Sequence, residues 1–74
     1  MSGFIFTTHV VVRMRQRGIR RLDIRRTVYD PDQVIPSFRG RRVAQRRIGT
    51  RTLEVVFTRE GRATVIVTAY WLEA

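Results

Sequence analysis

The chain has 74 residues, enough for one small domain with a modest hydrophobic core. Fifteen residues are basic, all of them arginine, and six are acidic, so the formal net charge at pH 7 is +9. Cysteine is absent and histidine occurs once, which excludes disulfides and thiolate metal sites and disfavours a zinc site.

The excess of arginine favours a polyanionic partner. A planar guanidinium group can make two parallel hydrogen bonds to a phosphate or a carboxylate. Because few acidic residues are present to pair with these cations, we expect RNA, DNA or an acidic protein as the partner. The alternative interpretation is a solvated basic surface that keeps the protein soluble.

The apolar segments predict a protein that stays out of the membrane. The longest apolar runs are a few residues, far short of the roughly 20 that cross a bilayer. The N-terminal apolar stretch is interrupted by threonine and histidine, and its positive charges follow it, unlike those of a signal peptide. The sequence therefore predicts a soluble, cytoplasmic protein.

A first helix is expected over residues 9–17, after a short apolar lead-in at residues 4–6. Thr8 is a suitable N-cap and Gly18 a suitable stop. At helical spacing, one side of this helix is apolar and carries Val10, Val11 and Met14. Another side is polar and carries His9, Arg13 and Gln16, with Arg17 at its edge.

A second helix is expected over residues 21–29. Asp30-Pro31 ends it, because a proline disfavours the helical conformation in the residue before it. The side predicted to face the core carries Ile24, Thr27 and Val28. Leu22 and Tyr29 fall on the opposite side, which predicts that this helix is contacted on both sides, by the core and by a partner.

The remainder of the chain predicts four strands, at residues 33–38, 41–48, 52–58 and 63–72. Pro36 favours an edge position for the first of them. Turns of two or three residues connect neighbouring antiparallel strands, so the strands should form a meander. The predicted fold is α+β, with two N-terminal helices packed on one face of a four-stranded antiparallel meander sheet.

Alternation of side chains divides the last two strands between two faces. The face expected to be covered by the helices carries Leu53, Val55, Phe57, Val65, Val67, Ala69 and Trp71. The other face, expected to stay at least partly open, carries Glu54, Val56, Thr58, Thr64, Ile66, Thr68 and Tyr70.

The strand with the sequence RRVAQRRI carries four candidate phosphate ligands. Arg42 and Arg46 project to one side of the sheet, and Arg41 and Arg47 project to the other. If the first pair shares the open face with Thr68 and Tyr70, that face offers forked cations beside hydroxyl groups, which suits an RNA phosphate. The alternative is a solvent-facing strand that charge protects against aggregation.

His9 is the one side chain that ordinarily exchanges its proton near neutral pH. The positive end of the helix dipole and the nearby arginines disfavour the imidazolium form. A neutral imidazole can take the proton of an RNA 2′-hydroxyl, and arginines can stabilise the charge that develops on phosphorus. This chemistry is metal-independent RNA cleavage through a cyclic phosphate. The alternative is a structural histidine that hydrogen-bonds a nearby carbonyl.

Other chemistries find little support in the sequence. The glycines are isolated at turns and form no phosphate-binding loop, and the six carboxylates form no evident pair or metal cluster. We therefore expect no cofactor and no metal.

Four segments resemble a widespread bacterial and archaeal domain of unknown function. They read THVVVRMRQRGI, DPDQV, GRRVAQRRIG and VIVTAYW, in this order, and span about residues 7–71. Members of that family share His-x3-Arg-x3-Arg-Gly-Ile, an Asn/Asp-Pro, a Gly-Arg-Arg-Val strand and a closing Val-x-Thr-x-Tyr. The residues that match these motifs are His9, Arg13, Arg17, Arg42, Thr68 and Tyr70.

The family is similar in expected topology to the RelE, ParE and BrnT toxins, several of which are RNases paired with an antitoxin. The resemblance therefore implies a toxin-like RNase, or mRNA interferase, of a toxin–antitoxin system. In this hypothesis His9 is the general base, Arg42 and Arg46 hold the phosphate, and Thr68 or Tyr70 orients it. The nucleic-acid-binding residues that extend the cationic groove are Arg13, Arg17, Arg41 and Arg47.

Two further hypotheses use the same surface. One is a nucleic-acid-binding module without catalysis, which needs the arginines but no particular histidine. The other is a basic interaction protein for an acidic partner such as an antitoxin, with Leu22 and Tyr29 at the interface.

Overall fold

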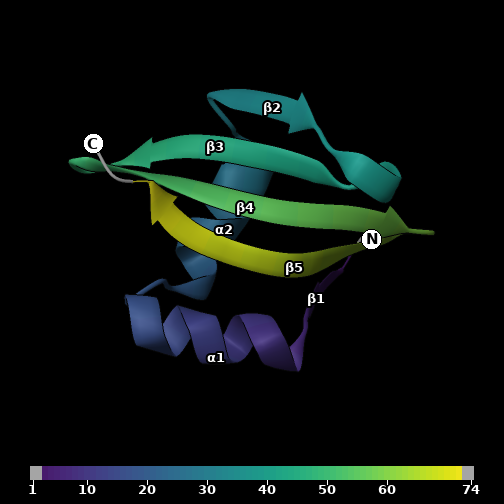
Figure 1. Ribbon diagram of the computed structural model, residues 1–74, viewed down its shortest axis with the longest axis horizontal. Coiled ribbons are helices and arrows are strands. Elements are labelled where there is room, and N and C mark those ends of the chain that lie inside the picture. Colours follow the sequence, from purple (N-terminus) through teal and green to yellow (C-terminus); the bar gives the residue numbers. More distant parts are fainter. Residues whose placement is uncertain (1–2, 73–74) are drawn as a thin grey trace.

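The computed structural model describes residues 3–72 and contains two α-helices and one five-stranded sheet (Figure 1). The elements in chain order are β1 (Phe4–Phe6), α1 (Thr8–Arg17), α2 (Arg21–Tyr29), β2 (Gln33–Pro36), a 3-10 turn η1 (Phe38–Gly40), β3 (Arg42–Ile48), β4 (Arg51–Glu60) and β5 (Ala63–Leu72).

The sheet is mixed, with the strand order β1-β5-β4-β3-β2. The four C-terminal strands form the predicted antiparallel meander, with β2 at one edge. The prediction of four strands was wrong in one respect, because β1 adds a fifth that runs parallel to β5. Three residues are too few for alternation to reveal a strand, and a parallel neighbour distant in sequence leaves no local turn signal. β1 forms because Phe4 and Phe6 pack against the core.

The start of α1 lies one residue earlier than predicted. The N-cap is Thr7, not Thr8: its Oγ1 accepts a hydrogen bond from the backbone N–H of Val10 at 3.2 Å and donates one to the carbonyl of Ile66 at 3.2 Å. The second bond connects the start of α1 to β5. This contact could not be predicted from spacing along the sequence. The predicted stop is confirmed, since Gly18 adopts a left-handed conformation with φ 64°.

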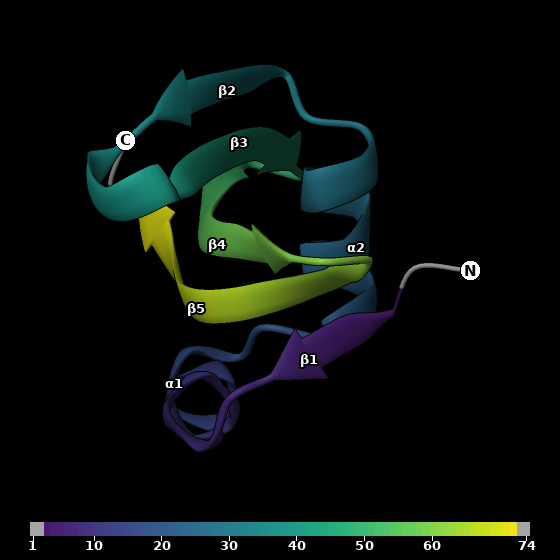
Figure 2. The same cartoon turned by 90° about the vertical axis from the view of Figure 1, so that its right-hand side faces the viewer.

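The two helices occupy different positions around the sheet. α2 packs on β3 and β4 and runs across the strands, behind the sheet in Figure 1. α1 packs on β5 and runs along it, at the end of the sheet where β1 also lies (Figures 1 and 2). β1 pairs only with the segment Thr64–Ile66, which leaves the rest of that side of β5 to α1. The prediction that both helices pack on one face of the sheet is therefore only partly confirmed. α2 covers a face, whereas α1 covers the edge formed by β5.

A register shift between Val56 and Phe57 changes which residues of β5 face α2. Val56 pairs with Thr68 but Phe57 pairs with Ile66, so β5 carries one extra residue. Beyond the shift, the alternation is reversed: Ile66 and Thr64 are buried on the helix side. The prediction that Val65 shares the covered face, with Thr64 and Ile66 on the open one, was therefore wrong.

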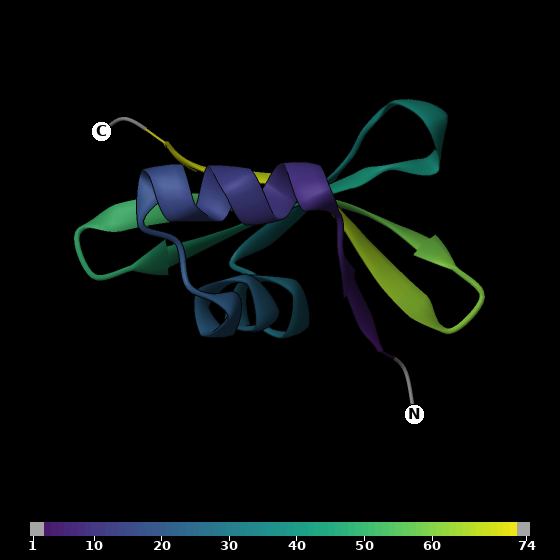
Figure 3. The same cartoon turned by 90° about the horizontal axis from the view of Figure 1, so that it is seen from below.

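The core lies between the sheet, α1 and α2. Figure 3 shows how the two helices and the sheet are arranged when seen from below. Its buried apolar residues are Val10, Met14, Ile19, Ile24, Ala44, Leu53, Val55, Phe57, Ile66 and Ala69. As predicted, Ile24 and Thr27 are buried whereas Leu22 and Tyr29 are exposed. Trp71 is partly buried against this core, and its Nε1 donates to the carbonyl of Arg17 at 2.8 Å. None of the helices in residues 3–72 is of a length and hydropathy that would cross a membrane.

Candidate nucleic-acid interface

The sheet face opposite α2, called the open face below, carries a row of hydrogen-bonded polar side chains. Strand register aligns Gln33, Gln45, Glu54 and Tyr70 across β2, β3, β4 and β5. The amide of Gln33 donates to Gln45 at 3.3 Å, and the amide of Gln45 donates to Oε1 of Glu54 at 2.6 Å. The hydroxyl of Tyr70 donates to Oε2 of Glu54. Both carboxylate oxygens of Glu54 are therefore engaged.

Glu54 is the residue that sequence analysis missed. It is only 9% exposed, although it stands on the open face of the sheet. A carboxylate withdrawn from water is costly unless hydrogen-bond donors replace the water, and here Gln45 and Tyr70 do so. The available signal was a lone acidic residue within an otherwise apolar strand segment, LEVVF. The tyrosine opposite it follows only from the register of the assembled sheet.

Helix α1 adds arginine to the edge of this row. Nη1 of Arg17 donates to the carbonyl of Ala69 at 2.8 Å, and the guanidinium carbon lies 6.0 Å from the centroid of the Tyr70 ring. The backbone of β5 thus anchors a cation beside the Tyr70 ring.

His9 and Arg13 precede Arg17 by two turns and one turn along the same side of α1. The helical register therefore puts the three residues on one flank of α1, and Arg17, the last of them, lies beside Tyr70. His9 is exposed, and Nη1 of Arg13 donates to Oε1 of Gln16 at 3.0 Å. Thr68 pairs with Val56 and lies on the same face as Tyr70, two residues before it in β5.

The structure corrects the predicted grouping of Arg42 and Arg46 with Thr68 and Tyr70. The register pairs Arg42 with Phe57 and Arg46 with Leu53, which are core residues of the helix side. Because directly paired residues point to the same face, both arginines lie on the face opposite Thr68 and Tyr70.

Arg46 has a structural partner on that helix side. Its Nη1 donates to the backbone carbonyl of Asp30 at 2.6 Å and to its carboxylate at 3.0 Å, at the end of α2. The prediction that Arg42, Arg46 and Tyr70 contact the same phosphate is therefore wrong. The alternation rule separated the faces of β3 properly, but only cross-strand register decides which face joins which.

Arg47 is the strand arginine that reaches the open face. It pairs with Thr52 in the register that places Gln45 opposite Glu54, and it is exposed. Its backbone N–H donates to the carboxylate of Asp32 at 2.8 Å, and its Nε donates to the carbonyl of Gly49 at 3.2 Å. Arg47 and Arg17 therefore come to the open face from different elements, β3 and α1.

Arg41 lies between η1 and β3, apart from the row on the open face. Its N–H donates to the carbonyl of Phe38 at 3.1 Å. It lines a hollow of about 430 Å³ together with Ser37, Phe38 and Arg39.

The combined arrangement is a face with hydroxyl, amide and carboxylate groups in the middle and guanidinium groups on two sides. In residues 3–72, no three histidine, aspartate or glutamate side chains gather in a way that would hold a metal ion. The open face thus brings guanidinium groups, which can pair with phosphates, close to a hydrogen-bonded tyrosine–carboxylate pair.

Comparison with known proteins places this fold in a family. The model of the domain-of-unknown-function family DUF4258 matches residues 6–71, and the chain belongs to this family, which confirms the resemblance inferred from its motifs. A solved structure with a similar fold is the ribonuclease toxin BrnT of Brucella abortus. The two are 15% identical, all of each chain is covered, and the TM-score is 0.76. No curated protein matches the sequence.

Proposed function

We propose that this protein is a toxin-like endoribonuclease that binds RNA on its open face. The observation that carries the proposal is the Tyr70 hydroxyl, which is bound to the buried carboxylate of Glu54 and lies beside the anchored guanidinium group of Arg17. The similarity in fold to a ribonuclease toxin supports the same class of activity.

The proposed substrate is single-stranded RNA. The arginines at the two sides of the face, Arg13, Arg17 and Arg47, bind the phosphates, and the hydroxyl of Thr68 supplements them. Arginine suits this role because its fork matches the geometry of a phosphate. The net charge of +9 attracts the RNA from a distance.

The proposed reaction is transfer of the phosphate to the neighbouring 2′-oxygen. Tyr70 takes the proton of the 2′-hydroxyl while its own proton passes to Glu54. The 2′-oxygen forms a bond to phosphorus, and the bond between phosphorus and the 5′-oxygen breaks. The leaving oxygen takes a proton from solvent and Glu54 returns its proton to solvent, so the products are a cyclic phosphate and a 5′-hydroxyl. Arg17 stabilises the charge that develops on the phosphate oxygens, and no step needs a metal.

His9 is the competing candidate for the base, as the sequence indicated. It is exposed on the same flank of α1, two turns before Arg17, and an imidazole there can take a proton directly. We favour Tyr70 as the base because a hydrogen bond to Glu54 fixes its hydroxyl and offers a route for its proton.

Cleavage of a labelled RNA by purified protein tests the proposal. We expect Tyr70→Phe and Glu54→Gln to lower kcat about 100-fold or more, the usual contribution of a proton-transfer group. Tyr29→Phe is the matched control, because Tyr29 is an exposed tyrosine on α2, and it should cleave like the wild type. The products should carry a cyclic phosphate.

The pattern across variants separates the possible outcomes. Loss of cleavage in His9→Ala with full activity in Tyr70→Phe would move the base to His9. Tight RNA binding with no product from the wild type, with and without ribosomes, would leave a nucleic-acid-binding module and contradict the nuclease. Expression of an active toxin should also arrest growth, and Glu54→Gln should relieve the arrest.

A further inference from the structure

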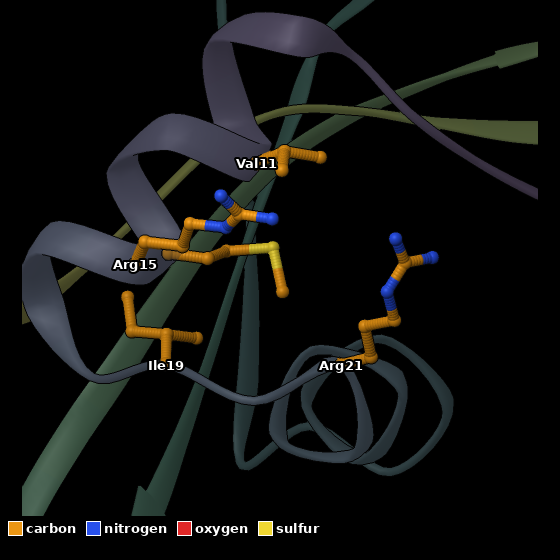
Figure 4. Close-up of a pocket in the computed structure, with 5 residues that line it drawn as sticks. Val11, Arg15, Ile19 and Arg21 are labelled. Atoms are coloured by element: carbon orange, nitrogen blue, oxygen red, sulfur yellow. The ribbon is translucent and has the colours of Figure 1, made fainter.

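A second surface lies between the two helices, on the other side of α1 from the His9–Arg17 flank. Val11, Met14 and Arg15 of α1, Ile19 of the connection and Arg21 of α2 line a hollow of about 260 Å³ there. Figure 4 shows Arg15 and Arg21 projecting from the two helices on opposite sides of this space. These five residues are called the interhelical groove below.

The interhelical groove combines an apolar floor with cationic walls. Met14 and Ile19 are 7% and 5% exposed and belong to the core, so the floor is apolar and well supported. Arg15 and Arg21 are exposed, and the five lining residues include no acidic side chain. A ligand that fits here brings an apolar group for the floor and negative charge for the walls.

The surface beside the groove continues this pattern along α2. The guanidinium carbon of Arg21 lies 4.7 Å from the ring centroid of Phe6, and that of Arg25 lies 5.4 Å from the ring centroid of Phe4. These contacts hold the cations in position, which lowers the entropic cost of binding an anion. Leu22 adds an exposed apolar side chain to the same helix, with 49% of its surface accessible.

The geometry favours a protein segment over RNA as the occupant. RNA bases bind by stacking on exposed aromatic rings, but here Arg21 and Arg25 stand over Phe6 and Phe4. The floor offers thioether and aliphatic groups, Met14 and Ile19, without hydrogen-bond donors for base edges. An aliphatic side chain fits such a floor, and aspartate or glutamate beside it complements the arginines.

We infer that the interhelical groove docks an acidic segment of a partner protein. One apolar side chain of that segment enters the hollow between α1 and α2, and flanking carboxylates pair with Arg15 and Arg21. The interface is separate from the open face, so the inference does not depend on the proposed RNA cleavage. None of the five residues that line the groove belongs to the row of polar side chains on the open face.

Binding of defined peptides to the intact protein tests this inference. The probe is a fluorescent peptide with a central leucine flanked by glutamates, and its affinity is measured by anisotropy. One control peptide has serine in place of the leucine, and another has lysines in place of the glutamates. We expect only the first peptide to bind well.

The protein variants compare two pairs of exposed arginines that change the net charge equally. We expect Arg15→Ala/Arg21→Ala to weaken peptide binding about tenfold or more, because the variant removes two partners for charge-assisted hydrogen bonds. Arg59→Ala/Arg62→Ala, at the turn between β4 and β5, should change the affinity by less than about threefold. Thermal unfolding should show that both double variants stay folded, and Arg15→Lys/Arg21→Lys should bind with intermediate affinity.

Three results would each overturn the inference. Equal weakening by the two double variants would reduce it to general charge attraction. Equal binding of the serine peptide would show that the hollow takes no apolar group. Displacement of the peptide by RNA, with the same loss of RNA affinity in Arg15→Ala/Arg21→Ala, would assign the groove to RNA.

Discussion

At the scale of single residues, two carboxylates within residues 3–72 are withdrawn from water, and different hydrogen-bond donors replace the water for each. Glu54 is bound by the neutral groups of Gln45 and Tyr70. Asp23, 3% exposed, is bound by Arg20. The backbone N–H and Nε of Arg20 donate to Oδ2 of Asp23 at 3.2 Å, and Nη2 donates to Oδ1 at 3.1 Å. Asp23 thereby closes the start of α2.

The pH dependence of stability should report the ion pair of Asp23. Burial acts to raise the pKa of Asp23, but the hydrogen bonds and the charge of Arg20 outweigh it, so the pKa lies below its ordinary value. A lowered folded-state pKa means that the folded protein favours the ionised form. The stabilisation is therefore present above the unfolded-state pKa, about 3.9, and is lost as the pH falls through the lower folded-state value.

We expect Asp23→Asn to lower the free energy of unfolding by about 1 kcal/mol at neutral pH, and the difference from the wild type to shrink in acid. Urea denaturation at a series of pH values measures it. Glu60→Gln, at an exposed position near the end of β4, is the control and should leave the pH profile unchanged. A constant difference between Asp23→Asn and the wild type at all pH values would contradict the role of the charge.

At the scale of elements, contact with β5 decides which of two neighbouring threonines caps the start of α1. Both Thr7 and Thr8 are suitable N-caps by residue type. Only the first has its hydroxyl between the helix and β5, where it both accepts from Val10 and donates to Ile66. The cap therefore joins α1 to the strand that it covers.

We expect Thr7→Ala to destabilise the protein by about 1–2 kcal/mol, since one hydroxyl makes the cap and the bond to β5. Thr8→Ala, one position later and exposed, should change the stability by less than about 0.5 kcal/mol. Chemical denaturation of both variants measures the difference. Equal effects, or a larger effect at Thr8, would place the cap at the position that sequence spacing favours.

At the scale of the whole molecule, the fold distributes the arginines behind the net charge of +9 over several separate surfaces. The two faces of β3 carry different arginines, with Arg47 on the open face and Arg42 on the helix face. The interhelical groove carries a third set. Binding of a polyanion to one surface should therefore depend on some arginines and not on others, although all contribute to the long-range attraction.

The salt dependence of RNA affinity should separate the two faces. Removing one arginine that binds a phosphate lowers the slope of log K against log salt by about 0.7 for a single strand. We expect Arg47→Ala to reduce this slope by about that amount and Arg42→Ala to leave it nearly unchanged. Titration of a single-stranded RNA at several salt concentrations measures the slopes. A larger change for Arg42→Ala would assign the RNA to the helix face.

The sequence by itself determined what depends on neighbours along the chain. The stop at Gly18, the helix at 21–29 and the meander of β2 to β5 follow from local conformation, short turns and alternation. Leu53, Val55 and Phe57 were assigned to the core for the same reason. The flank of α1 was also visible as a helical repeat of His9 and two arginines.

Only the tertiary structure decided what depends on pairing between distant segments. β1 exists because β5 offers it an edge, and the extra residue in β5 reverses which of its side chains are covered. Register then separates Arg42 from Tyr70 and brings Glu54 to it. A shift of one residue in pairing moves every side chain to the other face, and the sequence of β3, RVAQRRI, has no clear apolar alternation that would fix its register. The candidate site therefore follows from the register of the assembled sheet.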